Sequence, residues 1–293
     1  MSEPGSSEPG SIELGNIAYA YPDTESYVLH DLDFSAAAGK VTGIVGASGS
    51  GKTTLAKILA GFIPHVDGGQ LSGTVTVDRV DLASTPLVDA VAHVGLVIQN
   101  PYNQISGAKF TVREELAFGL ENRGTPRAEM IERIDEVATR LRITHLMERS
   151  PYALSGGQMQ LVAIGSMLVM RTPVLVLDEP TSQLDPGGTR MVFEVVSELV
   201  DAGSTVVIFE HKLEHMREHA DEIHVLAGGK LVLGGEPRSV LSDERLEEWG
   251  VGSTRYTLAA RFAAARGLLS PGEQLPVSLA EAVDTFRDGG RTE

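Results

Sequence analysis

Residues 46–53 read Gly46-Ala47-Ser48-Gly49-Ser50-Gly51-Lys52-Thr53, which fits the pattern G-x-x-x-x-G-K-[ST]. An apolar run, Val41 to Val45, precedes this loop, and a helix-forming run from Thr54 to Ala60 follows it. Glycines let the backbone curl, so that successive N–H groups and the start of the helix face an anion. Lys52 can then reach the β- and γ-phosphates of a nucleotide, and the Thr53 hydroxyl can bind Mg²⁺. A flexible Gly/Ser loop is the alternative, but the flanking strand and helix favour a phosphate site.

Further motifs follow in a fixed order along the chain. Leu154-Ser155-Gly156-Gly157-Gln158 lies well downstream of the loop, and Leu175-Val176-Leu177-Asp178-Glu179 comes shortly after. With the loop, they resemble the ATP-binding cassette (ABC) ATPases over about residues 12–235. The family has four further motifs: an aromatic residue in the A-loop, the Q-loop, the D-loop and a switch histidine. Their counterparts in this sequence are Tyr21, Gln99, Ser182-Gln183-Leu184-Asp185 and His211. The resemblance implies that Tyr21 and Gly46 to Thr54 bind ATP.

The candidate catalytic residues end apolar strand-like runs. Asp178 is placed to hold Mg²⁺, and Glu179 is the candidate base that polarises the attacking water. The resemblance implies that His211 bonds the γ-phosphate and orients Glu179, and that Gln99 contacts Mg²⁺ or the water. A solvated acidic pair is the alternative for Asp178 and Glu179, and the D-loop that ends at Asp185 argues against it.

Two other assignments leave competitors open. Tyr21 stands where the family stacks an aromatic ring on adenine, while Tyr19 competes for the role and a packed tyrosine is the structural alternative. His215 and His219 have the helical spacing of a metal stripe, but we favour a solvated helix face.

The signature motif predicts a two-subunit site. Ser155 and the amides of Gly156 and Gly157 open a helix, which is a second anion-binding N-terminus. In the family this element, with Gln158, contacts ATP held by the opposite subunit. The resemblance therefore implies a homodimer, or a heterodimer with another cassette, and a nearly inactive monomer.

Composition limits the remaining classes of function. The chain has 293 residues, 42% of them hydrophobic, a formal charge of -16 and no cysteine. These values predict a soluble globular protein without disulfides, and no secretion signal opens the sequence. Strong negative charge repels phosphate backbones, so we expect no nucleic-acid partner. The longest mostly apolar stretch, Leu161 to Met170, is far shorter than the roughly 20 residues of a membrane span.

We predict an α/β fold with a P-loop NTPase core, an antiparallel β-subdomain and an α-helical subdomain. Residues 1–11 are expected to be a disordered tail, residues 12–237 the cassette with its helical subdomain at about 100–165, and residues 238–293 a helical extension. Strands are expected at 12–20, 28–36, 71–77, 174–177 and 205–209, and a helix after Pro126 with Ile131, Ile134, Ala138 and Leu141 on its apolar face.

Two short amphipathic helices are expected in the extension. The first carries an apolar face of Leu258, Phe262, Ala265 and Leu269, and Pro271-Gly272 breaks it. A capping box of Ser278 and Glu281 precedes the second, whose apolar residues are Leu279, Val283 and Phe286. Such a pair is too small for a core of its own, so it must pack on the cassette or on a second copy.

The stretches Gln99 to Ile105 and Thr111 to Asn122 resemble the ATPases of energy-coupling factor (ECF) importers of vitamins or transition-metal ions, and so does the extension, which in that family helps pair the ATPases. The resemblance implies a transmembrane coupling (T) subunit, a substrate-binding (S) subunit and a position on the cytoplasmic face of the membrane. Tyr102, Gln104 and Ile105 are the expected coupling residues. Tyr102 replaces the family's usual acidic residue, and Leu161 replaces its usual arginine.

Two rival functions remain. A soluble cassette protein outside transport would need coiled-coil insertions, tandem cassettes or a basic face, and the sequence has none of these. Another phosphoryl-transfer enzyme with this loop would lack the Leu154–Gln158 motif and His211.

Overall fold

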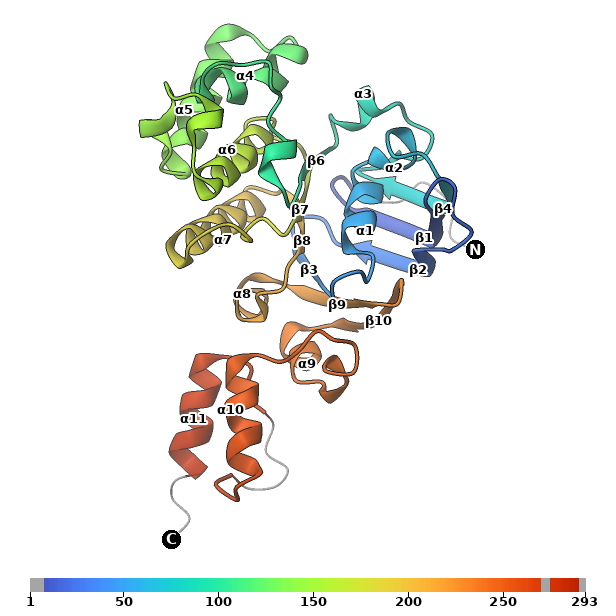
Figure 1. Cartoon of the computed structure of the whole chain (residues 1–293), viewed down its shortest axis with the longest axis vertical. Coiled ribbons are helices and arrows are strands. Elements are labelled where there is room, and N and C mark those ends of the chain that lie inside the picture. The colour runs from blue at the N-terminus through green and yellow to red at the C-terminus, as the bar shows by residue number, and fades with distance from the viewer. Residues whose placement is uncertain (1–7, 270–274, 290–293) are drawn as a thin grey trace.

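The computed structural model describes residues 8–269 and 275–289. It folds into two β-sheets with helices around them and a separate pair of helices at the C-terminal end (Figure 1). The predicted break at Pro271-Gly272 and most of the predicted tail lie outside the described residues.

The larger sheet positions the functional loops. Its strands lie in the order β10-β9-β3-β8-β7-β6, and all are parallel to their neighbours except β10. Their bounds are β3 (Val41–Val45), β6 (Val94–Val97), β7 (Val174–Asp178), β8 (Thr205–Phe209), β9 (Glu222–Ala227) and β10 (Lys230–Gly235). Strand β7 alternates between two cores, with Leu175 and Leu177 in one and Val174 and Val176 in the other. Continuous apolar strands are expected in a sheet that is covered on both faces.

The smaller sheet is antiparallel, with the order β2-β1-β4-β5. It consists of β1 (Ile12–Ala20), β2 (Leu29–Ala36), β4 (Gln70–Val77) and β5 (Val80–Asp81). Helix α1 (Lys52–Leu59) follows the glycine-rich loop, and its Leu55, Ile58 and Leu59 share the core between the two sheets. The short helices α2 (Phe62–His65) and α3 (Leu87–Ala90) complete this part of the molecule.

The helical subdomain covers the other face and lies at the top left of Figure 1. It contains α4 (Val112–Asn122), α5 (Arg127–Arg140) and α6 (Gly156–Leu168), with short 3-10 turns at Pro101–Asn103, Thr144–Leu146 and Pro151–Ala153. On α5, Ile134 and Ala138 are buried as predicted, and so is Leu141 at its end, but Ile131 is 46% exposed. Thr111 and Glu114 form a capping box that fixes the start of α4.

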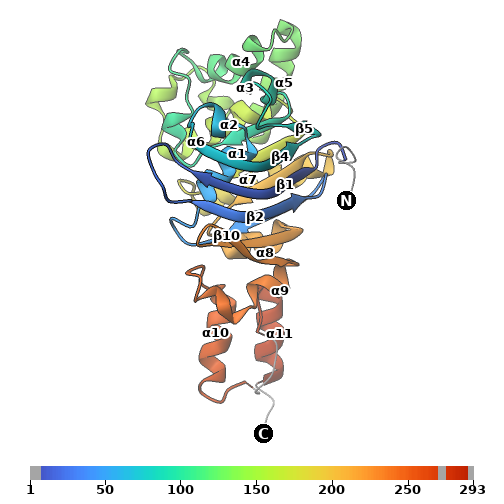
Figure 2. The ribbon, with the colours of Figure 1, turned by 90° about the vertical axis from the view of Figure 1, so that its right-hand side faces the viewer.

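The first residues after position 237 pack in the core of the cassette. Helix α7 (Pro186–Asp201) and α8 (Leu213–His219) flank the large sheet, and α9 (Pro237–Leu241) follows β10. Val240, Leu241 and Leu246 are buried in the core that lies under the helical subdomain. The expected boundary at residues 237/238 therefore falls within a continuous core, and only α10 (Arg255–Ala264) and α11 (Leu279–Gly289) project away from it (Figure 2).

The apolar face predicted for α10 is mostly exposed in the single chain. Leu258 and Phe262 are 43% and 63% exposed, whereas the buried residues of the helix are Thr257, Ala260 and Ala263. Leu269, the last residue of the predicted face, is buried beyond the end of the helix and packs with Ala260 and Ala263. The Thr257 hydroxyl donates to the Pro276 carbonyl 2.8 Å away, which turns this face of small residues toward the segment before α11. The exposed large side chains are therefore left on the outside of the helical pair.

The start of α11 also differs from the prediction. Ser278 Oγ accepts from the Glu281 amide at 3.3 Å, but the Glu281 carboxylate accepts from the Val277 amide and pairs with Arg217 instead of closing the box on Ser278. Leu279, Val283 and Phe286 are 61%, 43% and 42% exposed. The glutamate thus ties α11 to α8 on the cassette.

Candidate functional site

The glycine-rich loop joins the carboxyl end of β3 to α1. Gly51 has φ +109°, and a Cβ there would lie 2.6 Å from Leu29 Cδ2. A Cβ on Gly46 would lie 2.3 Å from the Leu226 carbonyl oxygen. Only glycine fits at these two positions, because one needs a left-handed backbone and the other a close approach of two main chains.

Lys52 is buried within the loop that it closes. Its ammonium donates to the carbonyls of Gly46 and Ala47 at 2.8 and 3.0 Å, and the residue is 6% exposed. Burial lowers the pKa of Lys52, with Glu179 and Asp178 opposing that shift. A phosphate in the loop would give the ammonium a stronger, charged acceptor than these carbonyls.

Asp178, at the carboxyl end of β7, is a buried carboxylate with an unused ligand atom. It is 2% exposed, and its Oδ1 has no hydrogen-bond partner among the described residues. Burial raises the pKa of Asp178, while a hydrogen bond from the Thr53 side chain lowers it. An unpartnered carboxylate oxygen beside a hydroxyl is a donor set that suits Mg²⁺.

Glu179 is held from two sides. Its Oε1 lies 2.7 Å from His211 Nε2, and its Oε2 accepts from Gln99 Nε2 at 2.6 Å. Its backbone has φ +49°, which is rare for a residue with a side chain. Such strain of about 1–3 kcal/mol persists only where the surroundings fix the conformation. The structure thus brings together the three predicted catalytic residues from the ends of β6, β7 and β8.

Glu210 is a supporting residue to which sequence analysis gave no role. It is 3% exposed, accepts the Thr181 hydroxyl and accepts the backbone amides of His211 and Lys212. Lys212 in turn donates to the Thr181 carbonyl at 2.9 Å. This network fixes the backbone on which the His211 imidazole stands. In the sequence, only the position of Glu210 next to His211 indicated a supporting role.

A cavity of about 270 Å³ lies over the loop. It is lined by loop residues and by Gln99, Glu179 and Val28, of which Val28 was predicted only as part of a strand.

Tyr19 is fully buried, and its hydroxyl donates to the Gly68 carbonyl. The partly exposed Tyr21 reaches the start of α1 through a 3.0 Å hydrogen bond to Thr54 Oγ1. Of the two tyrosines, only Tyr21 presents a surface on which adenine could stack.

The signature motif lies outside this cavity. Ser155 caps α6 in a capping box with Gln158, and a Cβ on Gly156 would lie 2.3 Å from Gln183 Oε1 in the D-loop. Asp185 caps α7 by accepting the Gly188 amide at 2.7 Å. The lining residues of the cavity include none of these, so Ser155 does not complete the phosphate site of its own chain.

The segment after Gln99 leads into a second groove. An apolar cavity of about 450 Å³ lies between the core and the helical subdomain, with Phe62, Val91, Phe118 and Met170 in its lining.

Tyr102, which follows β6, is 56% exposed. The Gln104 amide bonds Ile98 and Ala163, and Ile105 packs against the core. Among the three expected coupling residues, only Tyr102 is in the exposed class.

Three other residues singled out in the sequence lie in tertiary contacts. Leu161, which replaces the family's usual arginine, packs against the core. His215 and His219 do not form the solvated face that we favoured, because both rings stack on Phe193 with centroids 5.0 and 4.9 Å away. Burial lowers the pKa of His219.

Comparisons with known proteins identify the family of this chain. Residues 29–182 match the family model described as ABC transporter. The chain belongs to the ABC transporter family. It is therefore an ATP-binding and ATP-hydrolysing cassette, as its motifs indicated, and the predicted fold is confirmed.

Individual relatives of this ABC cassette are similar over most of its length. A putative ABC transporter ATP-binding protein of Pyrococcus abyssi is 41% identical over 80% of this chain and 84% of the relative. The energy-coupling factor transporter ATP-binding protein EcfA1 of Lacticaseibacillus paracasei is 42% identical over 78% of this chain and 79% of its own. A Methanosarcina mazei relative is 38% identical over 80% of this chain, which spans only 40% of that protein.

Solved structures show the same fold. The cbiO1 structure from Clostridium perfringens, described as part of the ABC transporter complex cbiONQ, has a TM-score of 0.71 and 28% identity. The match covers 89% of this chain and 100% of the other. No helix among the described residues is both long and apolar enough to cross a membrane.

Proposed function

We propose that this chain is the ATP-hydrolysing subunit of an ECF-type importer. The observation that carries the proposal is Glu179, held between His211 and Gln99 beside the glycine-rich loop. Two hydrogen bonds fix the carboxylate where a water would attack a γ-phosphate, as general-base catalysis needs. Relatives named as ECF ATP-binding proteins at 36–42% identity support the choice of importer class.

ATP and Mg²⁺ are the proposed cofactors. The loop amides and Lys52 would hold the phosphates, Tyr21 would stack on adenine, and Thr53, Asp178 and Gln99 would hold the ion. Bound Mg²⁺ would neutralise charge on the transferred phosphoryl group. Lys52 leaves the carbonyls of Gly46 and Ala47 for the γ-phosphate, while Glu179 takes the proton of the water and His211 keeps the carboxylate in position.

A second cassette is the proposed partner in catalysis. Ser155, Gly156, Gly157 and Gln158 lie outside the phosphate cavity of their own chain and would contact ATP bound to the opposite subunit. The exposed apolar side chains of α10 and α11 offer a surface on which two copies can pair; they are Leu258, Phe262, Leu279, Val283 and Phe286. Either an identical or a related cassette can supply this surface.

Membrane partners would use the apolar groove between the core and the helical subdomain. A groove of about 450 Å³ with a mostly apolar lining could receive the apolar side chains on one face of an amphipathic helix of a T subunit. Tyr102 would contact that subunit, and a separate S subunit would bind the imported vitamin or metal ion. With these partners, the cassette would be a peripheral subunit on the cytoplasmic face of the membrane.

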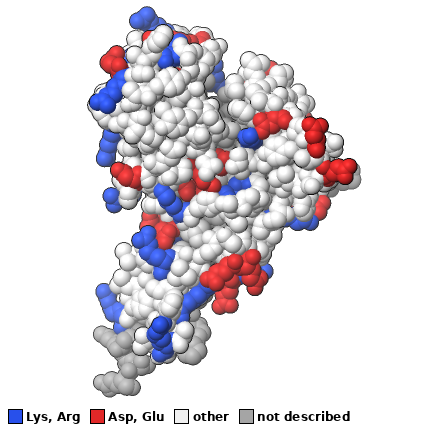
Figure 3. All heavy atoms as spheres, viewed as in Figure 1, with Lys and Arg blue, Asp and Glu red and all other residues white. Residues whose placement is uncertain are grey.

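The charge distribution gives no support to nucleic-acid binding. On the face shown in Figure 3, lysine and arginine side chains are scattered among acidic ones and form no continuous basic stripe. Nucleic-acid binding depends on such a stripe. A formal charge of -16 acts in the same direction.

The two-subunit site can be tested with mixed dimers. Lys52→Ala disables the loop of one chain, and Ser155→Arg blocks the signature of the other, so a mixed dimer keeps one intact site and one doubly damaged site. We expect the mixture to hydrolyse more ATP than either variant alone. Equal, background-level rates in dimers that demonstrably exchange subunits contradict a site that works independently across the dimer.

The importer class needs a separate test. Affinity capture of the intact chain from detergent-solubilised membranes, followed by mass spectrometry, should recover two membrane proteins in defined stoichiometry. Capture of ATPase-active chain without membrane proteins would favour a cassette that does not take part in transport.

A further inference from the structure

Three side chains at the end of α8 place ligand atoms around one point. His215, Glu218 and His219 follow the spacing i, i+3 and i+4, which puts them on the same side of a helix. One ligand atom from each lies within 4.8 Å of the others. We propose that His215, Glu218 and His219 bind a divalent d-block ion such as Zn²⁺, at a site separate from the nucleotide.

The distances suit a small ion. Glu218 Oε2 lies 3.8 Å from His215 Nδ1 and 4.0 Å from His219 Nε2. Ligands of a tetrahedral Zn²⁺ with bonds of about 2.0–2.2 Å lie roughly 3.3 Å apart, so the carboxylate needs to approach each ring by about 0.5–0.7 Å. The two histidine ligand atoms, within 4.8 Å of each other, would also have to close toward the ion. His215 Nδ1 is buried and has no hydrogen-bond partner among the described residues. A bound ion would give this nitrogen a partner.

Ser197 on α7 sets the tautomer of His219. Its hydroxyl donates to the Phe193 carbonyl at 3.1 Å and lies 3.4 Å from His219 Nδ1. With its proton directed to the Phe193 carbonyl, Ser197 Oγ would accept from Nδ1–H. The lone pair of the neutral ring is then on Nε2, which is the atom that faces Glu218. Metal-binding histidines commonly have such a partner on the second nitrogen.

Phe193 restrains both imidazoles. The His215 and His219 rings lie at 16° and 18° to its plane, with their centroids 6.4 Å apart. Ring stacking removes rotamers that an exposed histidine would sample, so less side-chain entropy remains to be lost on binding. Helix α8 lies next to α7, which carries Phe193 and Ser197 (Figure 1).

The ligand set determines the class of ion. Two imidazole nitrogens and one carboxylate suit Zn²⁺, Ni²⁺ or Co²⁺, whereas Mg²⁺ and Ca²⁺ prefer all-oxygen sites. The chain has no cysteine to compete for such ions. Three protein ligands leave a coordination position for water, as in exchangeable rather than closed structural sites.

The position of the site connects two parts of the molecule. Helix α8 begins two residues after His211, and its Glu214 and Arg217 pair with Arg255 and Glu281 of the extension. An ion that joins residues 215, 218 and 219 would hold the last turn of this seven-residue helix. Metal occupancy would therefore raise the stability of the segment between the catalytic histidine and the extension.

Calorimetric titration of the full chain with ZnCl₂, in excess Mg²⁺ and ADP, tests the proposal. We expect one Zn²⁺ per chain, and binding weaker by about tenfold or more for His215→Gln, His219→Gln and Glu218→Gln. Glu218→Gln matters most, because this exposed side chain makes no stacking contact whose loss would disturb the fold. The exposed His145, on the helical subdomain, supplies the matched control, and His145→Gln should bind as the parent does.

Two further measurements make the result decisive. Bound Co²⁺ should give visible d–d absorption that Zn²⁺ abolishes, and Zn²⁺ should raise the unfolding midpoint of the parent chain more than that of Glu218→Gln. The proposal is wrong if the parent binds no Zn²⁺ stoichiometrically, or if all three variants bind it as tightly as His145→Gln does.

Discussion

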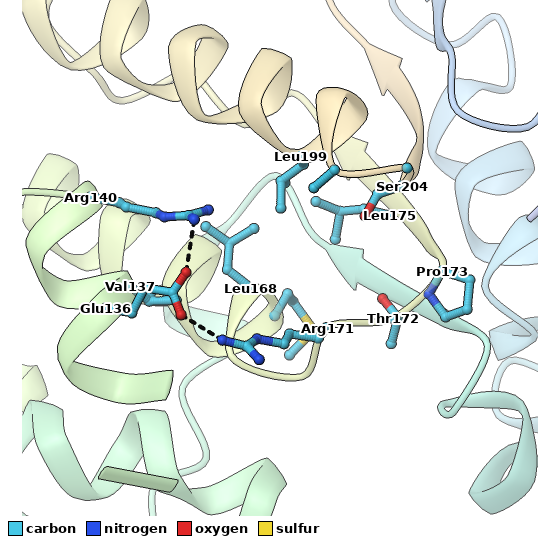
Figure 4. Close-up of a pocket in the computed structure, with 13 residues that line it drawn as sticks. Glu136, Val137, Arg140, Leu168, Arg171, Thr172, Pro173, Leu175, Leu199 and Ser204 are labelled. Atoms are coloured by element: carbon cyan, nitrogen blue, oxygen red, sulfur yellow. Dashed lines mark hydrogen bonds and ion pairs between the residues drawn. The ribbon is translucent and has the colours of Figure 1, made fainter. Parts of the chain in front are cut away.

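The two ends of strand β7 contrast sharply. At its carboxyl end stand Asp178, with an unpartnered buried oxygen, and Glu179, with a positive φ. At its amino end lies a cavity of about 430 Å³ between α5, α6 and α7 (Figure 4). There Glu136 pairs with both Arg140 and Arg171, and the Thr172 hydroxyl donates to the Val174 carbonyl.

The difference lies in buried charge. Both ends carry charged side chains near a cavity and a non-glycine residue with positive φ, Glu179 at +49° and Arg171 at +50°, but only the carboxyl end has a buried carboxylate oxygen without a hydrogen-bond partner. Such a group destabilises the nucleotide-free chain, so it persists where a ligand can offset its cost. The amino end has its charges paired, and we infer no ligand for it.

The largest expected effect comes from Glu179→Gln. Loss of a positioned base should lower ATP turnover by about a hundredfold or more, while nucleotide binding and the contact with Gln99 remain. Phosphate release and equilibrium nucleotide binding measure the two quantities, and the variant should also trap the closed dimer. The matched control is Glu136→Gln at the other end of β7. Near-parent turnover in Glu179→Gln refutes the role of this residue.

Asp178→Asn should separate function from stability. The variant should lose Mg²⁺-dependent turnover, yet the nucleotide-free chain should gain roughly 1–3 kcal/mol of unfolding free energy, because a buried charge is removed. Chemical denaturation without nucleotide measures the gain. An unchanged or lower unfolding free energy means that Asp178 is already compensated in the free chain.

The pH dependence of that gain has a defined sign. Burial raises the pKa of Asp178 in the fold, so protonation stabilises the folded state, and this contribution is lost as pH rises through the folded-state pKa. The advantage of Asp178→Asn should therefore be full at neutral pH and shrink as pH falls. A gain that does not change with pH would assign the effect to packing instead of charge.

Tyr102→Ala tests a residue that lies near the carboxyl ends of the strands but takes no part in ATP hydrolysis. Tyr102 follows β6, the strand beside β7, and its ring is exposed. Stacking on a cationic side chain of a membrane partner is worth about 0.5–2 kcal/mol, so assembly and transport should weaken while the isolated dimer hydrolyses ATP normally. Pull-down and uptake assays measure this. Unaltered assembly leaves Tyr102 as an exposed loop residue.

The smallest effect is expected from Arg171→Ala at the amino end. Its ion pair with Glu136 is partly exposed, and such pairs contribute about 1 kcal/mol or less. Glu136 keeps Arg140, so no buried charge is left alone. Turnover should match the parent within error. A large loss of turnover would show that the two ends of β7 are coupled and would break the contrast between them.

Where sequence analysis failed, long-range packing was responsible. Of the apolar face predicted for α10, Leu269 is buried, but it packs with the small residues Ala260 and Ala263, while Leu258 and Phe262 stay exposed in the single chain. His215 and His219 have a spacing that also fits a solvated helix. Their stacking depends on Phe193, which belongs to another helix and has no signal near them in the sequence.

The sequence by itself determined the glycine-rich loop and the buried strands, because these depend on backbone preferences and periodicities within a few residues, and the order of its motifs indicated the candidate catalytic residues. Tertiary structure alone decided that Gln99, Glu179 and His211 meet, that Tyr21 is accessible while Tyr19 is buried, and that Glu210 supports the switch histidine. Those contacts depend on the order of strands in the sheet. Strand order results from many weak long-range contacts, so no local stretch of sequence encodes it.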